Sequence, residues 1–569
     1  MYISKVTIDD YRGFSHFEAE LSKLTVIIGE NESGKSNFFS ALSLPLSNND
    51  INFNRKRLEV ADINSRKILQ FYKSIIEGED EATVLAKIPV VRVVIEIRDP
   101  RNEYEESLLK NWLCDDESGS LYSISYIFQP KKEDDLIKSA REILKGVTTI
   151  DDVSWFTFPI ENYDYQVSST NNGKQIGFRE LKRLSVNLIG AERDDFAQNN
   201  SVRSNNVLTR MLMSTLDDSE KAEIDKAYTT FFKTIEGTDT FQKLISPDPD
   251  FKNFSDYIED IDCIPNLPNL RSILSNITLK AGDVFLYQRG LGERNLIHIL
   301  ILFEYFKKEK KYFNLCCIEE PEAHLSVNNL KLATDFINKS TSEGTGLLQT
   351  LVSSHSPSVI NKLELSNVLV FSGDKAISLK KSSSDLQDYL RKRPNFDILK
   401  LLFANKLILV EGPTEEMLIN SVLQTQIDKL RAIDVVSIGH KGFRTFLDIW
   451  LEVNRGNAEK KIGIVRDYDG EDKAKADHDK YDAEHVNICV RTTVNQTLEN
   501  DLAEAGGNLS VMQDVFDLPD DCAAEDAANV MISDKAETML ALCDSILDLK
   551  KPKVVTLPPH IQEVIDFVS

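Results

Sequence analysis

The sequence lacks several features that would assign it to a class at once. Its seven cysteines are scattered and form no C-x-x-C pair, which favours a reduced cytoplasm over a disulfide scaffold. The longest apolar stretch, Leu296 to Phe303, is interrupted by His298 and is far too short to span a bilayer. The segment Met1 to Lys5 shows no signal-peptide pattern. We therefore expect a cytoplasmic protein with no membrane contact.

Basic residues are also scarce relative to acidic ones. Asp and Glu exceed Lys and Arg by 24 (91 minus 67). Nonspecific affinity for nucleic acid comes mainly from Lys and Arg, so DNA binding would need a local basic strip, helped by bound metal. The length of 569 residues predicts two to four domains, and the 41% hydrophobic content is ordinary for a globular protein.

The first motif present is G-x-x-x-x-G-K-[ST] at residues 29–36. A short apolar run at 24–28 predicts a buried strand before it, and an amphipathic helix is expected from Lys35. In this motif the glycines let backbone N–H groups close around phosphate oxygens, the lysine reaches the terminal phosphates, and the Ser36 hydroxyl ligates magnesium. The expected ATP contacts are Gly29, Asn31, Gly34, Lys35, Ser36 and Asn37.

A second apolar strand, at 314–318, ends in Glu319 and Glu320. One carboxylate at such a strand end can hold magnesium through water, which we assign to Glu319, and the next can polarise the attacking water, which we assign to Glu320. Two surface glutamates before a proline turn are the plain alternative. The functional interpretation is favoured because residues 351–357 follow at strand-plus-helix distance and place His355 to sense the γ-phosphate.

Gly290 and Gly292 precede an apolar helix, and glycines before a helix N-terminus can form an anion site. The order of P-loop, glycine-rich helix start, Glu-Glu and His resembles the ABC-type ATPases of the SMC and recombination-repair class. In that class the glycine-rich segment of one protomer closes on the ATP of another, so the resemblance implies a homodimer or higher homo-oligomer. Glu319 stands where ABC proteins usually have Asp.

Acidic residues also follow two strands of the C-terminal half. The apolar run 406–410 leads to Glu411, with Glu415 four residues later, and the run 461–465 leads to Asp467 and Asp469. Clustered carboxylates need cations, and hard oxygen ligands favour Mg²⁺ or Mn²⁺. Two such ions about 3.5–4 Å apart can activate a water and hold the leaving oxygen in phosphodiester cleavage. A lone Asp-x-Asp pair is common on surfaces, but E-G-x-x-E followed by D-x-D is the TOPRIM pattern.

The order of motifs over most of the chain resembles the OLD family of ATP-dependent endonucleases. The stretches that carry the resemblance are I-E-E-P-E-A-H-L at 318–325, S-S-H-S-P at 353–357, L-F-A-N-K-L-I-L-V-E-G-P-T-E at 402–415 and L-E-N-D-L at 498–502. Glu499 is a further candidate ligand. Lys535 is a candidate catalytic lysine that could stabilise charge on the scissile phosphate, although a solvated helix lysine is nearly as good an interpretation. His440 stands where a glycine is expected.

This resemblance implies the metal ligands Glu411, Glu415, Asp467, Asp469 and Glu499. It also implies nicking or cleavage of DNA, ATP as a regulator, and a role in defence against phage. A helicase, or a reverse transcriptase with its retron DNA, is the implied partner.

We predict an α/β protein with an ABC/SMC-like ATPase domain followed by a TOPRIM nuclease domain. The expected segments are the ATPase parts 1–195 and 266–375, a helical insertion at 196–265, a linker at 376–398 and the TOPRIM domain at 399–569. The insertion is either a dimerisation arm or an ordinary helical part of the first domain. One alternative is a DNA-sensing ATPase whose TOPRIM domain only binds a partner or DNA. A topoisomerase or primase relative is another, but no tyrosine-bearing domain or zinc-binding cysteine cluster supports it.

Overall fold

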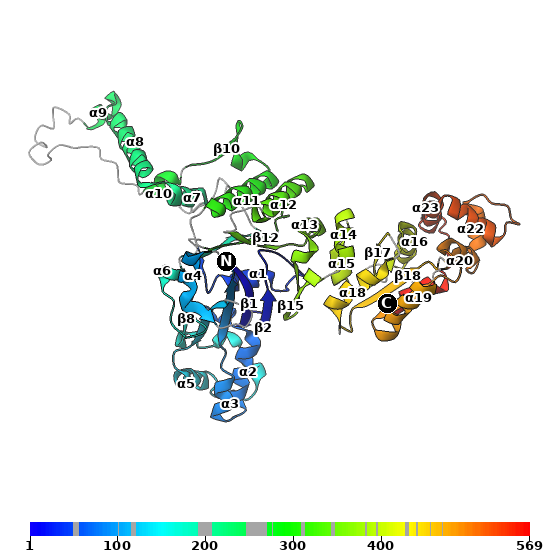
Figure 1. Ribbon diagram of the computed structural model, residues 1–569, viewed down its shortest axis with the longest axis horizontal. Helices are drawn as coiled ribbons and strands as arrows, with labels where there is room; N and C mark the ends of the chain where they lie inside the picture. The colour runs from blue at the N-terminus through cyan, green and yellow to red at the C-terminus, as the bar shows by residue number, and fades with distance from the viewer. Residues whose placement is uncertain are drawn as a thin grey trace, which may run out of the picture.

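A computed structural model shows the chain as two lobes side by side, with an arm on the side of the N-terminal lobe away from the C-terminal lobe (Figure 1). The structure describes residues 1–48, 56–100, 102–114, 121–181, 183–191, 207–245, 270–275, 277–308, 313–342, 348–381, 384–393, 396–426, 432–439, 442–455, 457–468, 470 and 472–569. Within these residues, no helix is long and apolar enough to cross a membrane.

The N-terminal lobe contains an antiparallel sheet. Its strand order is β2-β1-β5-β7-β6, and β8 also pairs with β7. In β5, every second residue from Val91 to Ile97 is buried, the period expected of a strand with one face on a core. The strands are β1 (Tyr2–Tyr11), β2 (Phe14–Glu20), β5 (Val91–Arg98), β6 (Leu113–Cys114), β7 (Leu121–Pro130) and β8 (Tyr163–Ser169).

A second sheet packs against the first and carries the nucleotide motifs. Its order is β15-β14-β3-β13-β12-β9-β4, parallel except where β15 joins β14. Residues of both sheets share one apolar core, in which Phe17 of β2 lies in the same cluster as Leu315 of β12. The strands are β3 (Leu24–Gly29), β4 (Ser47–Asn48), β9 (Leu184–Ile189), β12 (Phe313–Glu319), β13 (Leu348–Ser353), β14 (Val368–Ser372) and β15 (Lys375–Ser378).

Helices surround this lobe, and some of them form the arm. Figure 1 shows α8 and α9 leading away from the sheets, and the helix α8 has no buried residue. The described part of the predicted insertion is helical, and its role in dimerisation stays a prediction. The larger helices are α1 (Lys35–Leu42), α2 (Ser65–Ile76), α5 (Glu133–Ile143), α7 (Val207–Thr215), α8 (Asp218–Glu236), α9 (Asp239–Ile245), α11 (Leu291–Lys308), α12 (Val327–Ser342) and α13 (Pro357–Lys362).

The segment 376–398, predicted as a linker, is largely folded in its described residues. Most of β15 belongs to it and extends the second sheet, and α14 (Ser384–Lys392) follows. Leu386 and Leu390, four residues apart on α14, are buried in a core cluster that also contains β3 and C-terminal strand residues. The two lobes therefore share a continuous apolar contact.

The C-terminal lobe is built on a four-stranded parallel sheet of order β17-β16-β18-β19. The helix α24 packs on its centre, where a Cβ atom on Gly463 would lie 2.3 Å from Val564. The strands are β16 (Lys406–Val410), β17 (Asp434–Ser437), β18 (Lys461–Arg466) and β19 (Ile488–Thr492). The helices around them include α15 (Ile398–Phe403), α16 (Pro413–Gln424), α18 (Phe443–Asn454), α19 (Asp472–Glu484), α20 (Leu498–Glu504), α22 (Ala524–Ser533), α23 (Lys535–Ile546) and α24 (Pro559–Val568).

Candidate nucleotide and metal sites

The P-loop lies where the sequence predicts it, between the buried strand β3 and the helix α1. Gly34 has φ of 90°, a conformation that glycine adopts without steric cost, and a Cβ atom there would lie 2.6 Å from the Phe14 ring. A Cβ atom on Gly29 would lie 2.9 Å from the Phe371 carbonyl oxygen. A larger residue at either position would not fit the shape of the loop, and glycine also leaves room for a phosphate.

Lys35 is 8% exposed, and its ammonium group bonds to the loop itself. Its Nζ donates to the carbonyl oxygens of Gly29 and Glu30, each at 2.9 Å, and to Ser33 Oγ at 3.4 Å. Burial lowers the pKa of Lys35, and the negative charges of Glu320 and Glu322 oppose that shift. A terminal phosphate entering the loop would have to draw Lys35 away from these two carbonyl groups.

Glu319 ends β12 and Glu320 follows it, and this strand end is separated from the P-loop strand β3 by β13 alone. Glu320 has φ of 42°, a left-handed conformation that is uncommon for a side chain of this kind, and its N–H donates to the Ser353 carbonyl at 2.9 Å. Such conformations cluster at functional sites. His355 follows β13, and its pKa is lowered by burial and by the charge of Lys35, while Glu320 opposes the shift. Lys35, Glu320 and His355 therefore form one electrostatic cluster.

Sequence reasoning missed Glu322 as a member of this site. Its Oε1 accepts hydrogen bonds from Ser354 Oγ at 2.9 Å and from the His355 N–H at 2.6 Å, and burial raises its pKa. Glu322 thus fixes the turn that carries His355. The only signal for it in the sequence is its place in the I-E-E-P-E stretch. Asn37, predicted as an ATP contact, accepts a hydrogen bond from Arg12 at 3.0 Å.

Gly290 and Gly292 lie at the start of α11 as predicted. A Cβ atom on Gly292 would lie 2.7 Å from the His324 carbonyl oxygen, so glycine is needed here for close packing against the turn after β12. Gly290 is exposed, and a Cβ atom there would meet no other atom within 4 Å among the described residues. Closure of this segment over the nucleotide of a second copy stays a prediction.

The C-terminal carboxylates meet at one edge of the four-stranded sheet. Val410 pairs with Val465 in the parallel ladder between β16 and β18. Glu411 comes directly after β16 and Asp467 directly after β18, so the two residues emerge at neighbouring strand ends. Leu498, at the start of α20, donates its N–H to Asp467 Oδ1 at 3.1 Å and so brings Glu499 to the same place.

Burial and mutual repulsion both act against the ionised form of Asp467. The pKa of Asp467 is raised to about 8, first by burial and then by the negative charges of Glu415, Glu411 and Glu499, while Lys535 opposes the shift.

Two of the other carboxylates, Glu415 and Glu499, have partners within the protein. Glu415 Oε2 accepts hydrogen bonds from the Gly412 N–H and from Thr414 Oγ1, both at 3.1 Å. Glu499 is 2% exposed and pairs through Oε1 with Lys535 Nζ at 2.9 Å. The pKa of Lys535 is raised: burial lowers it, but the bond to Glu499 and the nearby carboxylates outweigh burial.

The donor set suits a hard divalent cation. Glu499 Oε2 is one of the described side-chain oxygens that are buried without a hydrogen-bond partner. Such an oxygen is available to coordinate a cation. As the described side chains stand, no three of them are arranged to hold a metal ion together. Two predicted features, Asp469 and the His440 turn, lie outside the described residues. Binding of a cation would require Glu415 or Glu499 to leave its present partners.

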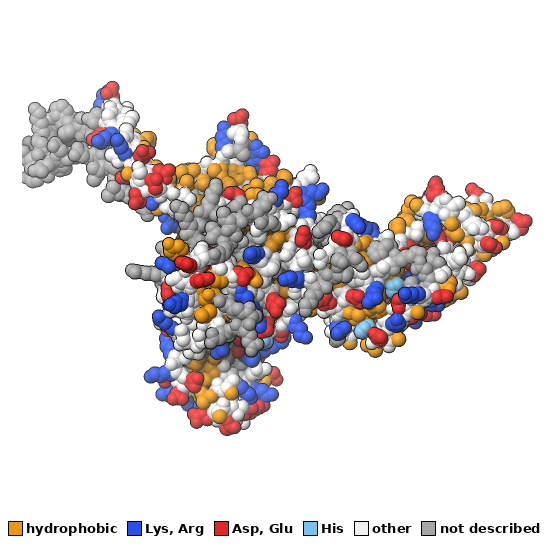
Figure 2. Space-filling view, in the orientation of Figure 1, with side chains coloured by type: hydrophobic (Ala, Val, Ile, Leu, Met, Phe, Trp, Pro, Cys, Tyr) orange, Lys and Arg blue, Asp and Glu red, His pale blue; other side chains and the backbone are white. Residues whose placement is uncertain are grey.

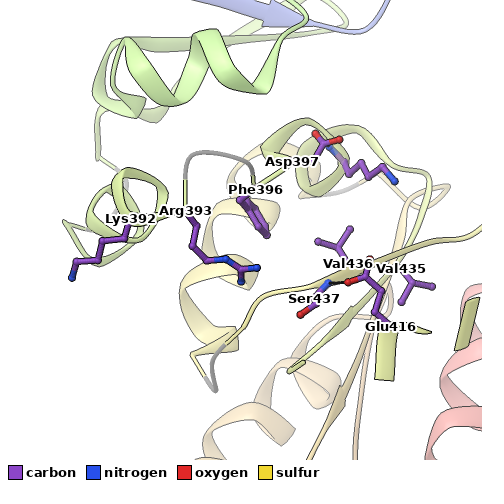
Figure 3. A pocket seen from close by; sticks show the side chains of 9 residues that line it. Lys392, Arg393, Phe396, Asp397, Glu416, Val435, Val436 and Ser437 are labelled. Atoms are coloured by element: carbon purple, nitrogen blue, oxygen red, sulfur yellow. Dashed lines mark hydrogen bonds between the residues drawn. The ribbon is translucent and has the colours of Figure 1, made fainter. Parts of the chain in front are cut away.

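A cavity of about 480 Å³ lies at the outer edge of β17, beside the Glu411 strand end. Figure 3 shows the Arg393 guanidinium pointing into it across from Ser437, whose N–H donates to Glu416 at 3.2 Å. Arg393 also donates to the Ile438 carbonyl at 2.8 Å. The lining residues are Lys392, Arg393, Phe396, Asp397, Lys400, Glu416, Val435, Val436 and Ser437. On the face shown in Figure 2, Lys and Arg side chains are interspersed with Asp and Glu.

Comparisons with known proteins define the class. Residues 1–360 match the AAA ATPase domain, and residues 402–469 match the TOPRIM domain of proteins like the overcoming lysogenization defect protein. The chain therefore belongs to the AAA ATPase domain family. An OLD-like TOPRIM domain lies C-terminal to the ATPase domain, in the predicted order. The α/β fold class predicted from the sequence is confirmed.

A curated relative is Endonuclease GajA of Bacillus cereus (strain HuB5-5), which is 23% identical over 464 residues, or 69% of this chain and 64% of the relative. Solved structures that resemble the chain include an SmcHead bound to the C-winged helix domain of ScpA, 14% identical, with a TM-score of 0.35. That match covers 67% of this chain and 100% of the other. The SMC head domain from Thermotoga maritima is 12% identical, with a TM-score of 0.27 and coverage of 66% and 97%.

Proposed function

We propose that the chain is a divalent-metal-dependent DNA endonuclease whose cutting is regulated by ATP. The observation that carries this proposal is the group of carboxylates at the ends of β16 and β18, with an Asp467 pKa of about 8. Such concentrated negative charge beside a phosphate backbone would oppose DNA binding unless cations neutralise it. The TOPRIM match and the endonuclease relative support the same chemistry.

In this proposal Glu411, Glu415, Asp467, Asp469 and Glu499 hold Mg²⁺ or Mn²⁺. When bound, these ions supply activation of a water and stabilisation of the leaving oxygen in phosphodiester hydrolysis. Lys535, whose Nζ lies 2.9 Å from Glu499 Oε1, is the residue that would stabilise charge on the scissile phosphate in this proposal. At the other site, the P-loop and Glu319 would hold ATP and its magnesium, and Glu320 would polarise the attacking water.

DNA would approach the carboxylates past the cavity beside β17. Lys392, Arg393 and Lys400 line it, against the acidic Asp397 and Glu416. In a chain with 24 more acidic than basic residues, this group is a candidate for the local basic strip that a DNA backbone requires. Homodimerisation through the ATPase lobe, a phage-defence role and a helicase or reverse-transcriptase partner complete the proposal.

The test is cleavage of supercoiled plasmid with each divalent ion, with and without ATP. We expect nicked or linear product only with Mg²⁺ or Mn²⁺, and loss of that product in Asp467→Ala. Cutting by Asp467→Ala at the wild-type rate would overturn the proposal. Absence of cutting by the wild type with every divalent ion would instead leave the alternative, a DNA-sensing ATPase whose TOPRIM domain only binds.

A further inference from the structure

A direct ion pair joins the P-loop to the TOPRIM domain. Lys460 Nζ lies 3.1 Å from Glu30 Oε1, although the two residues are 430 positions apart in the sequence. Glu30 follows the first glycine of the P-loop and its side chain is 57% exposed, whereas that of Lys460 is only 10% exposed. Lys460 is thus held in place by the protein, and the loop residue is the partner that can move.

Further contacts fix Lys460 to the base of the TOPRIM sheet. Its Nζ donates to the Phe403 carbonyl at 3.0 Å and lies 5.6 Å from the centre of the Phe403 ring. Phe403 ends α15, which leads into β16, and Lys460 immediately precedes β18. The Lys461 N–H donates to the Asn405 carbonyl at 2.8 Å and ties the two strand starts together.

These same two strands end at the carboxylates. The strand β16 delivers Glu411 and β18 delivers Asp467, in a continuous parallel ladder. At about 3.3 Å per residue, six residues of β18 span about 20 Å between the Lys460 contact and the carboxylate edge. Both strands contribute buried residues to the apolar cluster that also includes β3, the strand leading to the P-loop. Close-packed cores of this kind transmit small displacements.

A nucleotide in the P-loop would alter the surroundings of Glu30, the residue with which Lys460 pairs. Lys35 now donates to the Glu30 carbonyl oxygen at 2.9 Å, and it must leave that oxygen to reach a terminal phosphate. The backbone of Glu30 is then released on one side while its carboxylate remains paired with Lys460. The ion pair is therefore placed to detect whether the loop is empty or filled.

We propose that the Glu30–Lys460 ion pair couples nucleotide occupancy to the TOPRIM carboxylates through β16 and β18. This inference rests on the proposed function, because it names how ATP regulates that site. Lys460 is a positioning residue, because it acts through Glu30 of the P-loop and the Phe403 carbonyl of the TOPRIM domain. Its loss should uncouple the two sites and leave each of them formed.

The experiment compares the wild type with Lys460→Met and Glu30→Gln in the full-length protein. Three quantities are measured: the affinity for ATP, the ratio of plasmid cleavage rates with and without ATP, and hydrogen exchange with and without ATP. We expect both variants to bind ATP within about threefold of the wild type while the cleavage ratio falls to within about twofold of one, since an allosteric effect disappears when its coupling contact is removed. The double variant should lose no more than either single variant.

Glu32→Gln is the matched control, because it removes the same charge from an exposed position of the same loop. It should keep the wild-type cleavage ratio. In hydrogen exchange, ATP should alter segments 406–410 and 461–466 in the wild type but not in Lys460→Met. If wild-type protein cuts no DNA with any ion, the proposed function fails, and hydrogen exchange still decides the coupling. Wild-type responses to ATP in Lys460→Met would overturn the inference.

Discussion

Replacement of Asp467 by Asn should stabilise the protein in the absence of metal. Burial and the negative charges of Glu415, Glu411 and Glu499 disfavour the ionised form of Asp467 and raise its pKa from 3.8 to about 8. Asn keeps the shape of the side chain and an oxygen that can still accept the 3.1 Å hydrogen bond from the Leu498 N–H. The substitution therefore removes the ionisable group and little else.

The direction of the pH effect follows from the raised pKa. Between about pH 4 and pH 8 the folded protein holds a proton on Asp467 that the unfolded chain has lost, so the free energy of unfolding decreases as pH rises through this window. At pH 7 the pH lies about three units above the pKa of Asp467 in the unfolded chain, and each unit corresponds to about 1.4 kcal/mol. The cost to the free energy of unfolding is therefore about 4 kcal/mol. In Asp467→Asn this cost is absent.

The assay is thermal unfolding in a chelator at pH 5 and pH 7.5. The stability advantage of Asp467→Asn should be small at pH 5 and should grow to roughly 10 °C in the transition of the TOPRIM domain at pH 7.5. Mn²⁺ should then stabilise the wild type and shrink the difference, because a cation neutralises the carboxylate that Asn lacks. Asp477→Asn, on the exposed face of α19, is the control. Equal stability of wild type and Asp467→Asn at both pH values, with equal gains from Mn²⁺, would refute this reasoning.

Four further variants test the remaining sites. Lys35→Ala should abolish ATP binding and the ATP effect on cutting while metal-dependent cleavage persists, as measured by nucleotide titration beside the plasmid assay. Glu320→Gln should bind ATP but hydrolyse it at least about 100-fold more slowly, which phosphate release would show. Lys535→Met should lower the cleavage rate about 100-fold, whereas an unchanged rate would assign Lys535 to a solvated helix surface. Arg393→Ala with Lys392→Ala should weaken DNA binding at every sequence and flatten its dependence on salt.

Local patterns were enough to predict the domain order and most of the strands that carry functional residues. The P-loop strand, the strand ending at Glu319 and the strands leading to Glu411 and Asp467 are short apolar runs followed by polar residues, a pattern typical of parallel sheets. Parallel strands bring such ends to one edge, so the sequence could also predict that Glu411 and Asp467 lie side by side. Glu499 and Lys535 come from helices, and only the family resemblance pointed to them.

Contacts between distant segments could not be predicted in this way. The Glu30–Lys460 pair joins two charged loop residues, and nothing in composition or periodicity distinguishes Lys460 from the many lysines on solvated surfaces. The role of Glu322 could not be predicted either, because it depends on the turn after β13, which folds back against Glu322. The serines at 382–384 suggested a linker, but Leu386 and Leu390 lie four residues apart, and that spacing indicates the buried face of α14.

Anomalous diffraction from crystals grown with Mn²⁺ tests the central claim most directly. The account predicts manganese peaks at about 2.0–2.3 Å from carboxylate oxygens of Glu411, Asp467 and Glu499, with Lys535 or Glu415 moved away from its present partner, and no such peaks in Asp467→Asn. Manganese bound elsewhere on the chain, with these carboxylates keeping their present hydrogen bonds and ion pair, would contradict it.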